Sequence, residues 1–356
     1  MNRILVDQQK ITQTQADATD AAPLAAGEAR LTLESFALTA NNVTYAASGF
    51  AIGYWKFFPT GKAGQGLVPV WGIAEVTESR CDALAPGTRL YGFYPMADQL
   101  VIQPEVSARG NVTDVAAHRR ELPAVYNSYV PVGQTTPDQD HIRALLQPLL
   151  ATSYLLSDWL EDNAYFGAQQ VIVGSASSKT GLGLCKYLAE KHDRAFRIVG
   201  LTSERNRAFV EGLGACDSVL SYDQIADIAQ APAVYVDMAG NAQVKASLHG
   251  HLKDQLKHSA AVGISHWDQF NPSVALEGVK PEFFFAPAQI AKRRQEWGPG
   301  EIDRRITDAF MRLAGQASDW LTVKVHHGLE TAPAVYAALA QGTADPREGH
   351  IIRLIP

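Results

Sequence analysis

The clearest pattern in the chain runs from about residue 143 to residue 290, where apolar segments of strand length alternate with segments of helical periodicity. The predicted strands are QQVIVG, FRIVGLT, DSVLSY, AVYVDMAG and HSAAVGI, and the predicted helices include TGLGLCKYLAEKH, RNRAFVEGLG and NAQVKASLHGHL. Strands that alternate with helices form a parallel sheet, because each strand can return in the same direction only through a crossover. The pattern therefore predicts an α/β fold with a parallel sheet in this range.

The N-terminal part has a different pattern, in which short apolar runs are separated by Gly and Pro. Between about Glu28 and Pro104, the runs ARLTLES, VPVWGIAEV and DQLVIQP predict strands. Pro86 and Gly87 predict a tight turn between two such runs, because Pro presets φ and Gly permits positive φ. This part is expected to be a compact, β-rich unit.

The remaining segments are less uniform. Residues 105–142 are polar and irregular, and the segment IRALLQPLLATSYLLSDWLED that follows has the spacing of a long helix. Beyond Pro281 we expect a helix from about Gly300 to Gln316, the strand WLTVKV, the helix TAPAVYAALAQG and a last strand in GHIIRLIP.

Length and composition agree with two globular domains. The chain has 356 residues, 46% of them apolar and 19% charged, and a chain of this length usually divides into two cores. No stretch approaches the roughly 20 apolar residues that cross a bilayer, and the polar start lacks the apolar core of a secretion signal. We therefore expect a cytoplasmic protein that does not associate with membranes.

Charge and cysteine content exclude further classes. The net charge is −6 and the 31 Lys and Arg residues are scattered, so no basic stripe is available to follow a nucleic-acid backbone. The three cysteines, Cys81, Cys185 and Cys216, are odd in number and form no C-x-x-C pair. This argues against a disulfide framework and against a structural zinc site.

The most informative segment is VIVGSASSKTGLGLCKYLAE, residues 171–190, in which an apolar strand leads through a turn of small residues directly into a helix. Such a turn aims backbone N–H groups and the positive end of the helix dipole at one point, which favours a phosphate. The spacing differs from G-x-G-x-x-G. The residues expected to contact a cofactor here are Gly174, Ser175, Ser177, Ser178, Lys179, Thr180 and Gly181.

Two alternatives stay open for this turn. In a nucleotide triphosphatase, Lys179 and Thr180 would belong to a P-loop and Asp237 would hold the magnesium ion, although Lys179 stands one residue early and Ser178 replaces a glycine. The turn could also be a plain connection between strand and helix without a ligand.

The next predicted strand indicates which dinucleotide is bound. It ends in Thr202, Ser203 and Arg205 without an acidic residue at its end, and hydroxyls with an arginine suit the 2′-phosphate of NADP(H). Glu204 weakens this interpretation, and Arg205 and Arg207 could simply lie at the start of a helix.

Several segments together resemble the zinc-free branch of the medium-chain dehydrogenase/reductase superfamily, which includes quinone oxidoreductases and enoyl reductases. FALTANNVTYA resembles the segment beside the nicotinamide, LAPGTRLYGFYPMADQLVI resembles a conserved strand pair, and AVYVDMAGN resembles the strand that ends beside the nicotinamide ribose. LLATSYLLSDWL and GLETAPAVYAALAQGTADPREGHIIRLIP are similar to the interdomain helix and the C-terminal helix and strand. The glycine turn departs from the family pattern and indicates a divergent branch.

The resemblance implies a Rossmann-type, doubly wound parallel sheet (residues 143–290) inserted into a GroES-like β-rich substrate domain (residues 1–142 plus 291–356), with the active site between them. It also implies a homodimer formed by edge strands that include part of Phe283-Phe284-Phe285. The remaining candidates for contact with NADP(H) are Thr152, Tyr222, Met238, Ala239, Gly240, Val262, Gly263 and Phe285.

A zinc mechanism is not expected. The zinc-dependent members place Cys and His ligands near NNVTYA, whereas residues 28–80 contain neither, and a catalytic zinc needs about three protein ligands. The pairs His249/His251 and His326/His327 each lack a third ligand in their pattern. Without a metal, hydride transfer needs a proton donor for the reduced product.

For this donor the resemblance favours Tyr45, with Asn42 as its orienting partner. Many aromatic residues in the same segments predict a small apolar or aromatic substrate. The sequence thus predicts a zinc-independent NADPH-dependent oxidoreductase that reduces an enone, quinone or reactive carbonyl. The alternative is a non-catalytic NADPH-binding sensor or scaffold of the same fold.

Overall fold

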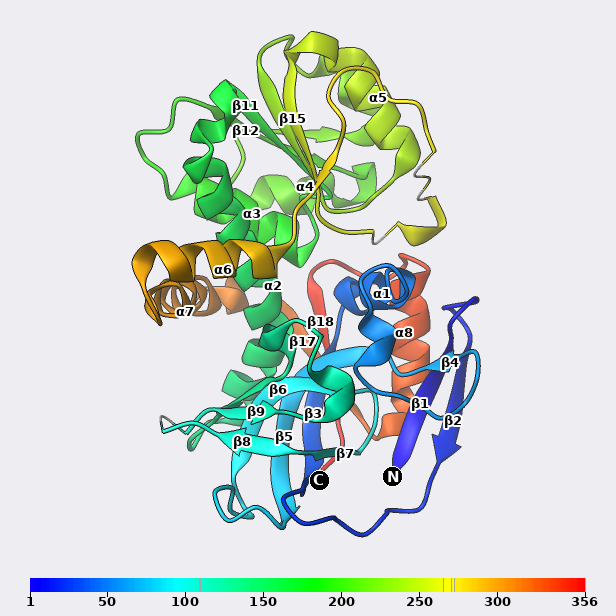
Figure 1. Ribbon diagram of the computed structural model, residues 1–356. Helices are drawn as coiled ribbons and strands as arrows, with labels where there is room; N and C mark the ends of the chain where they lie inside the picture. Colours follow the sequence, from blue (N-terminus) through cyan, green and yellow to red (C-terminus); the bar gives the residue numbers. More distant parts are fainter. Residues whose placement is uncertain (109, 265, 270, 272, 356) are drawn as a thin grey trace. The chain divides into compact units, whose positions relative to one another are not determined.

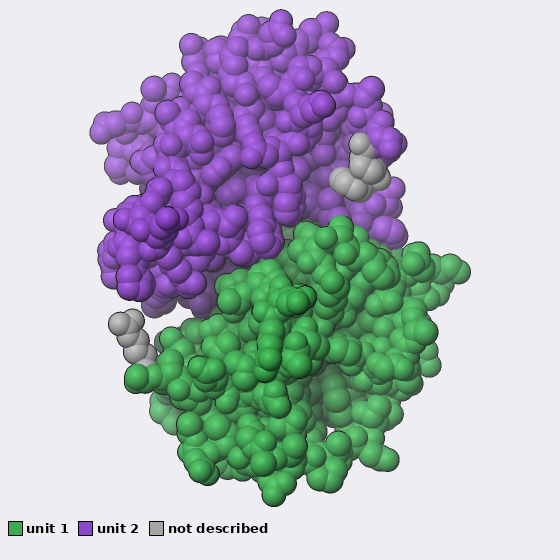
Figure 2. All heavy atoms as spheres, in the orientation of Figure 1, with its two compact units in different colours: residues 1–145, 321–356 green, residues 146–320 purple. Residues whose placement is uncertain are grey.

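The computed structural model describes residues 1–108, 110–264, 266–269, 271 and 273–355 and divides the chain into two compact units (Figures 1 and 2). Unit 1 comprises Met1–Leu145 and Leu321–Pro356, and unit 2 comprises Leu146–Trp320. Unit 2 is therefore one continuous segment, whereas unit 1 is built from both ends of the chain.

Unit 2 contains a sheet of parallel strands with the order β13-β12-β11-β14-β15-β16. In order along the chain, this sheet order reads 3-2-1-4-5-6, which is that of the Rossmann fold. The topological switch point, where the strand order reverses, lies between β11 and β14. The strands are β11 (Gln170–Gly174), β12 (Arg197–Thr202), β13 (Ser218–Ser221), β14 (Ala233–Asp237), β15 (Leu256–Ala261) and β16 (Glu282–Phe283).

Both faces of this sheet are covered, as the continuous apolar strands predict. Along β11, Val171 and Val173 join a core with side chains of α2 and α3, whereas Ile172 joins a core with α5 on the opposite face. This alternation confirms the predicted doubly wound α/β fold. The helices of unit 2 are the second half of α2 (Pro137–Asp162), α3 (Lys179–Ala189), α4 (Glu204–Gly212), α5 (Ala242–Leu252), α6 (Ala286–Trp297) and α7 (Glu301–Ala314).

Unit 1 is β-rich. One sheet has the order β2-β1-β4, and a larger one runs β17-β18-β3-β5-β6-β10-β9-β8, with β7 paired to β3. The helices of this unit are α1 (Ala40–Ala47), α8 (Ala332–Ala340) and the start of α2. The strands are β1 (Asn2–Asp7), β2 (Thr14–Ala18), β3 (Ala29–Leu38), β4 (Gln65–Gly66), β5 (Pro69–Ser79), β6 (Arg89–Pro95), β7 (Gln99–Ile102), β8 (Pro104–Val106), β9 (Val112–Asp114), β10 (Ser128–Pro131), β17 (Thr322–His327) and β18 (Glu348–Arg353).

The C-terminal segment returns to the N-terminal sheet, as the resemblance implied. β18 pairs with β3 in antiparallel register, with Ile351 opposite Ala37, and β17 lies parallel to β18. Burial explains the arrangement, because Ile351 and Ile352 are fully buried in the sheet. The Rossmann-type unit is thus an insertion into the β-rich one.

The division between the units lies further along the chain than the boundary expected at residue 291. Residues 291–320 belong to unit 2, because α6 and α7 contribute to its core. Ile302 is fully buried there, and Arg293 and Gln289 of α6 both contact Asp158 of α2, at 2.8 and 2.6 Å.

The segment expected to be irregular, residues 105–142, contains short strands and helical turns held by a buried ion pair. Arg119 is fully buried, and its guanidinium donates to Asp114 Oδ2 at 3.0 Å and to the Tyr129 hydroxyl at 2.8 Å. Removing one partner of such a pair leaves a buried charge without compensation. A separate feature of the whole fold is that none of the described residues form a helix with the length and apolarity needed to cross a membrane.

Candidate functional site

The glycine turn joins β11 to α3 at the switch point of the parallel sheet. β11 ends at Gly174, and Ser175 follows with φ of 52°, a left-handed conformation that is unfavourable for residues other than glycine. Such strain persists where the surrounding structure enforces it, often at functional sites. Ligands of open α/β sheets bind at this position, outside the carboxyl ends of the strands.

Glycine is required at two positions of α3. A Cβ atom at Gly181 would lie 2.5 Å from the Ser175 carbonyl oxygen, and one at Gly183 would lie 2.6 Å from Ser153 Oγ. The lack of a side chain at Gly181 lets the turn fold tightly over the start of α3. The lack of one at Gly183 lets α3 pack closely on α2. Ser153 also contacts the start of α3, since its hydroxyl lies 2.7 Å from the Thr180 carbonyl oxygen.

The start of α3 is capped by a side chain of the turn. Ser178 is the N-cap residue, and its hydroxyl accepts a hydrogen bond from the Gly181 N–H at 3.1 Å. An α-helix begins with four N–H groups that lack partners within the helix, and the positive end of its dipole lies there. Ser178 therefore orders this end of the helix while using one N–H, and Lys179 adds a half-buried positive charge.

The residues at the end of β12 divide into two kinds. Thr202 is fully buried and donates to Ser177 Oγ at 3.0 Å, and Asn206 donates to the same hydroxyl at 3.2 Å. Ser203 is half-buried and Arg205 is exposed at the start of α4. Thr202 and Asn206 thus order the turn through Ser177, and no sequence pattern indicated Asn206. The roles of Ser203 and Arg205 toward a 2′-phosphate stay predictions.

The end of β14 carries a buried carboxylate that is engaged within the protein. Asp237 Oδ1 accepts from the N–H groups of Ala239 and Gly240 at 3.0 and 2.9 Å, and Lys245 Nζ lies 3.2 Å from Oδ2. Asp237 therefore shapes the loop that contains Met238, Ala239 and Gly240. This bonding disfavours the triphosphatase interpretation, in which Asp237 would face magnesium.

Val262 and Gly263 continue β15 at the same edge of the sheet. Their N–H groups donate to the Asp237 carbonyl at 2.9 and 3.3 Å. A Cβ atom at Gly263 would lie 2.5 Å from the Met238 carbonyl oxygen. The glycine therefore permits the close approach of the two loops.

Tyr222 follows directly after the strand β13, at the same edge of the sheet. Burial raises its pKa to about 12, while a hydrogen bond with Ser175 has the opposite effect. Its ring contacts that of His266 at 6.4 Å between centroids, and burial lowers the pKa of His266. Tyr222 thus contacts the glycine turn through Ser175, and its role toward a cofactor stays a prediction.

Two predicted cofactor residues lie on other elements of unit 2. Thr152 is on α2, where its hydroxyl donates to the Pro148 carbonyl at 3.0 Å and satisfies a backbone group near the proline. Phe285 precedes α6, and its ring stacks on Phe283 at 6.1 Å. These contacts account for both residues within the fold, and their roles toward a cofactor stay predictions.

In unit 1, Asn42 is a capping residue of α1. Its Oδ1 accepts from the Thr39 N–H at 2.7 Å, and its Nδ2 donates to the Pro69 carbonyl at 2.8 Å. The side chain is 3% exposed. Both ends of the amide are therefore engaged in holding α1 to the strand β5.

Tyr45 lies one turn further along α1, in a cluster of aromatic rings. It is 5% exposed, its ring contacts Tyr54 and Phe93, and its hydroxyl oxygen accepts from Trp71 Nε1 at 3.1 Å. Burial raises the pKa of Tyr45 well above its usual value, whereas the hydrogen bonds from Trp71 and Asn41 act in the opposite direction. Because the Tyr45 oxygen accepts from Trp71, this hydrogen bond does not consume the O–H hydrogen.

The histidines singled out in the sequence are engaged in contacts within their own units. His249 is fully buried, with its ring nitrogens 3.0 Å from the Ser259 hydroxyl and 3.0 Å from the Glu277 carbonyl. His326 contacts His350 on the neighbouring strand at 3.2 Å. Within the described part of the chain, no three His, Cys, Asp or Glu side chains gather in a way that could hold a metal ion.

A doubly wound parallel sheet with a tight glycine turn at its switch point, inserted into a β-rich unit made from both chain ends, defines the fold of the medium-chain dehydrogenase/reductases. Within proteins of this fold, the chain belongs to the family described as "Protein of unknown function (DUF2855)", whose model matches residues 36–345. A search of curated proteins found no match.

Solved structures resemble the chain along its whole length. CurA from Vibrio vulnificus in complex with NADPH has a TM-score of 0.67 and 14% identity, with 100% of both chains covered. The yhdH oxidoreductase from Salmonella enterica in complex with NADP has a TM-score of 0.54 and 14% identity, covering 99% of this chain and 100% of the other. The complex of Etr1p with NADP and crotonyl-CoA has a TM-score of 0.55 and 12% identity, covering 99% of each. At these identities the likeness establishes the fold.

Proposed function

We propose that the protein is an NADPH-dependent oxidoreductase that reduces an enone, a quinone or a reactive carbonyl without zinc. The observation that carries this proposal is the glycine turn at the switch point, where Ser175 is strained and Gly181 leaves no room for a side chain. Structures of the same fold are described as complexes with NADPH or NADP, which supports the choice of cofactor.

The residues around the turn fit a dinucleotide. The start of α3 would hold the bridging phosphates, since helix N-termini stabilise phosphate charge through their N–H groups and dipole. Ser203 and Arg205 would bind the 2′-phosphate, where the arginine supplies a charge-assisted hydrogen bond. Met238–Gly240 and Val262–Gly263 would border the rest of the cofactor.

When bound, the nicotinamide would supply a hydride to the substrate. Tyr45 would then deliver the proton. Trp71 Nε1 donates to its oxygen at 3.1 Å and offsets part of the rise in pKa that burial causes. Since the Asn42 amide is engaged in capping α1, we assign the orienting role to Asn41 and Trp71. The aromatic rings around Tyr45 favour a small apolar or aromatic substrate.

We further propose that the protein is a cytoplasmic homodimer. β16 lies at the edge of the parallel sheet, and its Phe283 is 53% exposed and stacked on Phe285. A large exposed aromatic side chain at a sheet edge favours association. Sedimentation of the protein and of Phe283→Asp should give a dimer and a monomer; a monomeric parent protein would contradict this part of the proposal.

The function is tested by cofactor titration followed by turnover. We expect the fluorescence of the pure protein to report saturable binding of NADPH and weaker binding of NADH. Oxidation of NADPH should then accelerate with at least one member of a panel of quinones, enals and ketones. Tight NADPH binding without turnover of any of them would favour the non-catalytic sensor or scaffold, and no binding of either cofactor would contradict both functions.

A further inference from the structure

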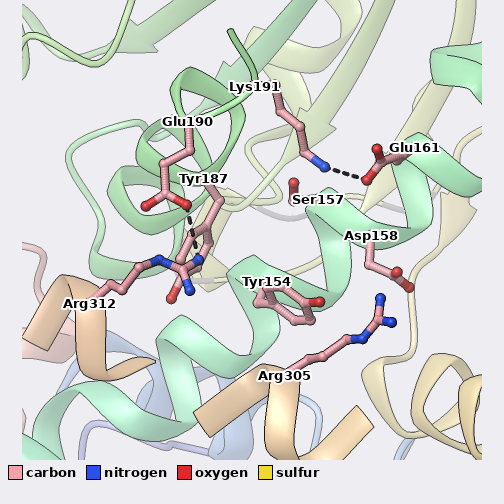
Figure 3. Close-up of a pocket in the computed structure, with 9 residues that line it drawn as sticks. All are labelled: Tyr154, Ser157, Asp158, Glu161, Tyr187, Glu190, Lys191, Arg305 and Arg312. Carbon is pink, nitrogen blue, oxygen red and sulfur yellow. Dashed lines mark hydrogen bonds and ion pairs between the residues drawn. The ribbon is translucent and has the colours of Figure 1, made fainter. Parts of the chain in front are cut away.

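A hollow of about 280 Å³ lies in unit 2 at the end of α3 opposite to the glycine turn (Figure 3). Since α3 has 11 residues and rises about 1.5 Å per residue, the two ends are about 16 Å apart. The walls come from α2, the C-terminal end of α3 and α7. The lining residues are Tyr154, Ser157, Asp158, Glu161, Tyr187, Glu190, Lys191, Arg305 and Arg312.

The hollow contains a buried hydroxyl that lacks a partner. Tyr187 is 3% exposed, and its hydroxyl oxygen has no hydrogen-bond partner among the described residues. A buried polar group without a hydrogen-bond partner lowers the stability of the fold by about 1–3 kcal/mol. Figure 3 shows this hydroxyl beside the guanidinium of Arg312, so a ligand that contacts both groups would relieve the cost.

The lining carries three carboxylates and three cations, and the cations differ in how firmly they are paired. Asp158 pairs at 2.8 Å with Arg293, which lies outside the hollow and also contacts Asp162 and Glu296. The remaining carboxylates, Glu161 and Glu190, face three cations, Lys191, Arg305 and Arg312. Arg305 is paired with Glu301 at 2.7 Å, and Arg304, which shares Glu301, has a second partner in Asp308 at 2.6 Å. The cations whose partners in the hollow are solvent-exposed are therefore Arg312 and Lys191.

The ion pairs at the mouth of the hollow can be exchanged for a ligand. Arg312 contacts Glu190 at 3.1 Å, but the two side chains are 53% and 41% exposed, and the pair of Lys191 with Glu161 is similarly open to solvent. Exposed pairs of this kind contribute only about 0–1 kcal/mol. A ligand carboxylate could therefore replace Glu190 on Arg312 at little cost.

Two aromatic rings complete the walls. Tyr154 and Tyr187 meet edge to face, with 5.9 Å between their centroids and an angle of 88° between their planes. In Figure 3, Tyr154 lies between Tyr187 and Arg305. The rings offer an apolar surface next to the cationic one, which suits a ligand that joins a carboxylate to an aromatic ring.

We propose that this hollow is a second ligand site, which binds a small aromatic carboxylate through Arg312, the Tyr187 hydroxyl and the ring of Tyr154. Arg305 adds positive charge on the same helix. The proposal does not rest on the function proposed for the glycine turn, because none of its residues belong to that turn.

The test uses benzoate as the probe and the full chain without cofactor, with binding followed by ligand-observed NMR or calorimetry. We expect saturable binding of benzoate, and at least tenfold weaker binding of benzamide, which has the same shape without the charge. Arg312→Gln should weaken benzoate binding about tenfold or more, as the loss of a charge-assisted hydrogen bond predicts. Tyr187→Phe should weaken it by a smaller factor.

The matched control is Arg304→Gln, which changes an exposed arginine of the same helix outside the hollow. It should leave benzoate binding within twofold of the parent, and circular dichroism should show that all variants are folded. Three results would overturn the proposal: no saturable benzoate binding up to about 10 mM, equal effects of Arg312→Gln and Arg304→Gln, or displacement of benzoate by NADPH in direct competition.

Discussion

The glycine turn of unit 2 and the α1 segment of unit 1 both start a helix with small polar residues, yet their polar groups are used differently. Ser178 caps α3 through one hydroxyl, and the absence of a side chain at Gly181 keeps the turn tight. At α1, Thr39 and Asn42 cap the helix reciprocally, and Asn42 is also bound to Pro69. Helix-capping residue types therefore do not distinguish a ligand site, whereas glycines that permit close backbone approach are more informative.

The largest expected effect concerns the proton donor. Tyr45→Phe should lower kcat for NADPH-dependent reduction about 100-fold, because general acid catalysis typically contributes factors of this size. The affinity for NADPH should change less than twofold, as measured by fluorescence titration.

The control for this variant is Tyr54→Phe, which removes a hydroxyl from the same aromatic cluster. The Tyr54 hydroxyl contacts that of Tyr126 at 3.0 Å and has no place in the proposed proton transfer. Unchanged turnover in Tyr45→Phe would contradict the proposed proton donor. The α1 segment would then have a structural role only, unlike the glycine turn.

A second variant addresses the glycine turn directly. Gly181→Ala places a Cβ atom 2.5 Å from the Ser175 carbonyl oxygen, so the turn must shift. We expect at least a tenfold loss of NADPH affinity in fluorescence titration, corresponding to about 1.4 kcal/mol.

Gly212→Ala is its control, because nothing lies within 4 Å of a Cβ atom at that helical position. It should bind NADPH as the parent does. If both variants bind equally well, the tight turn does not form the cofactor site.

The third effect separates the two cofactors. Arg205→Gln should weaken NADPH binding about tenfold through loss of a charge-assisted contact with the 2′-phosphate, and should leave NADH binding unchanged. Arg207→Gln serves as the control, since Arg207 is paired with Glu211 at 2.9 Å. An equal loss for NADH and NADPH would show that Arg205 acts on the fold and not on the phosphate.

The smallest effect is on stability alone. Asn42→Ala removes a helix cap and leaves the Pro69 carbonyl without its donor, so the free energy of unfolding should fall by about 1–2 kcal/mol. Urea denaturation measures this change, and NADPH affinity should stay the same. The exposed Asn111→Ala should alter neither quantity, and a loss of cofactor binding in Asn42→Ala would link α1 to the cofactor after all.

The sequence predicted the Rossmann-type unit well because its signals are local. Buried parallel strands such as β11 appear as short apolar runs, and the helix start at Lys179 follows directly from the turn of small residues. The order of these elements, combined with right-handed crossovers, leaves few alternative folds. The strand-turn-helix unit was therefore accessible without a structure, whereas the insertion was expected only from the resemblance to a known superfamily.

Other features depend on contacts between distant residues and have no local signal. The hydrogen bond from Thr202 to Ser177 and the contact of Asn206 with the same hydroxyl become visible only when β12 lies beside β11. Arg119 looks like a surface residue in its polar segment, yet it is fully buried because Asp114 and Tyr129 compensate its charge. Periodicity could not reveal either arrangement.

The pairing of β18 with β3 has a consequence for synthesis of the protein. Ile351 is the partner of Ala37, so one edge of β3 stays unpaired until about 314 further residues have been translated. Translation adds about 5–20 residues per second, so this delay is on the order of half a minute. The continuous segment of unit 2 is translated within that time, before β18. An open strand edge of this kind can pair with a neighbouring nascent chain, and substitutions that prevent β18 (Glu348–Arg353) from pairing should therefore cause aggregation of newly made protein.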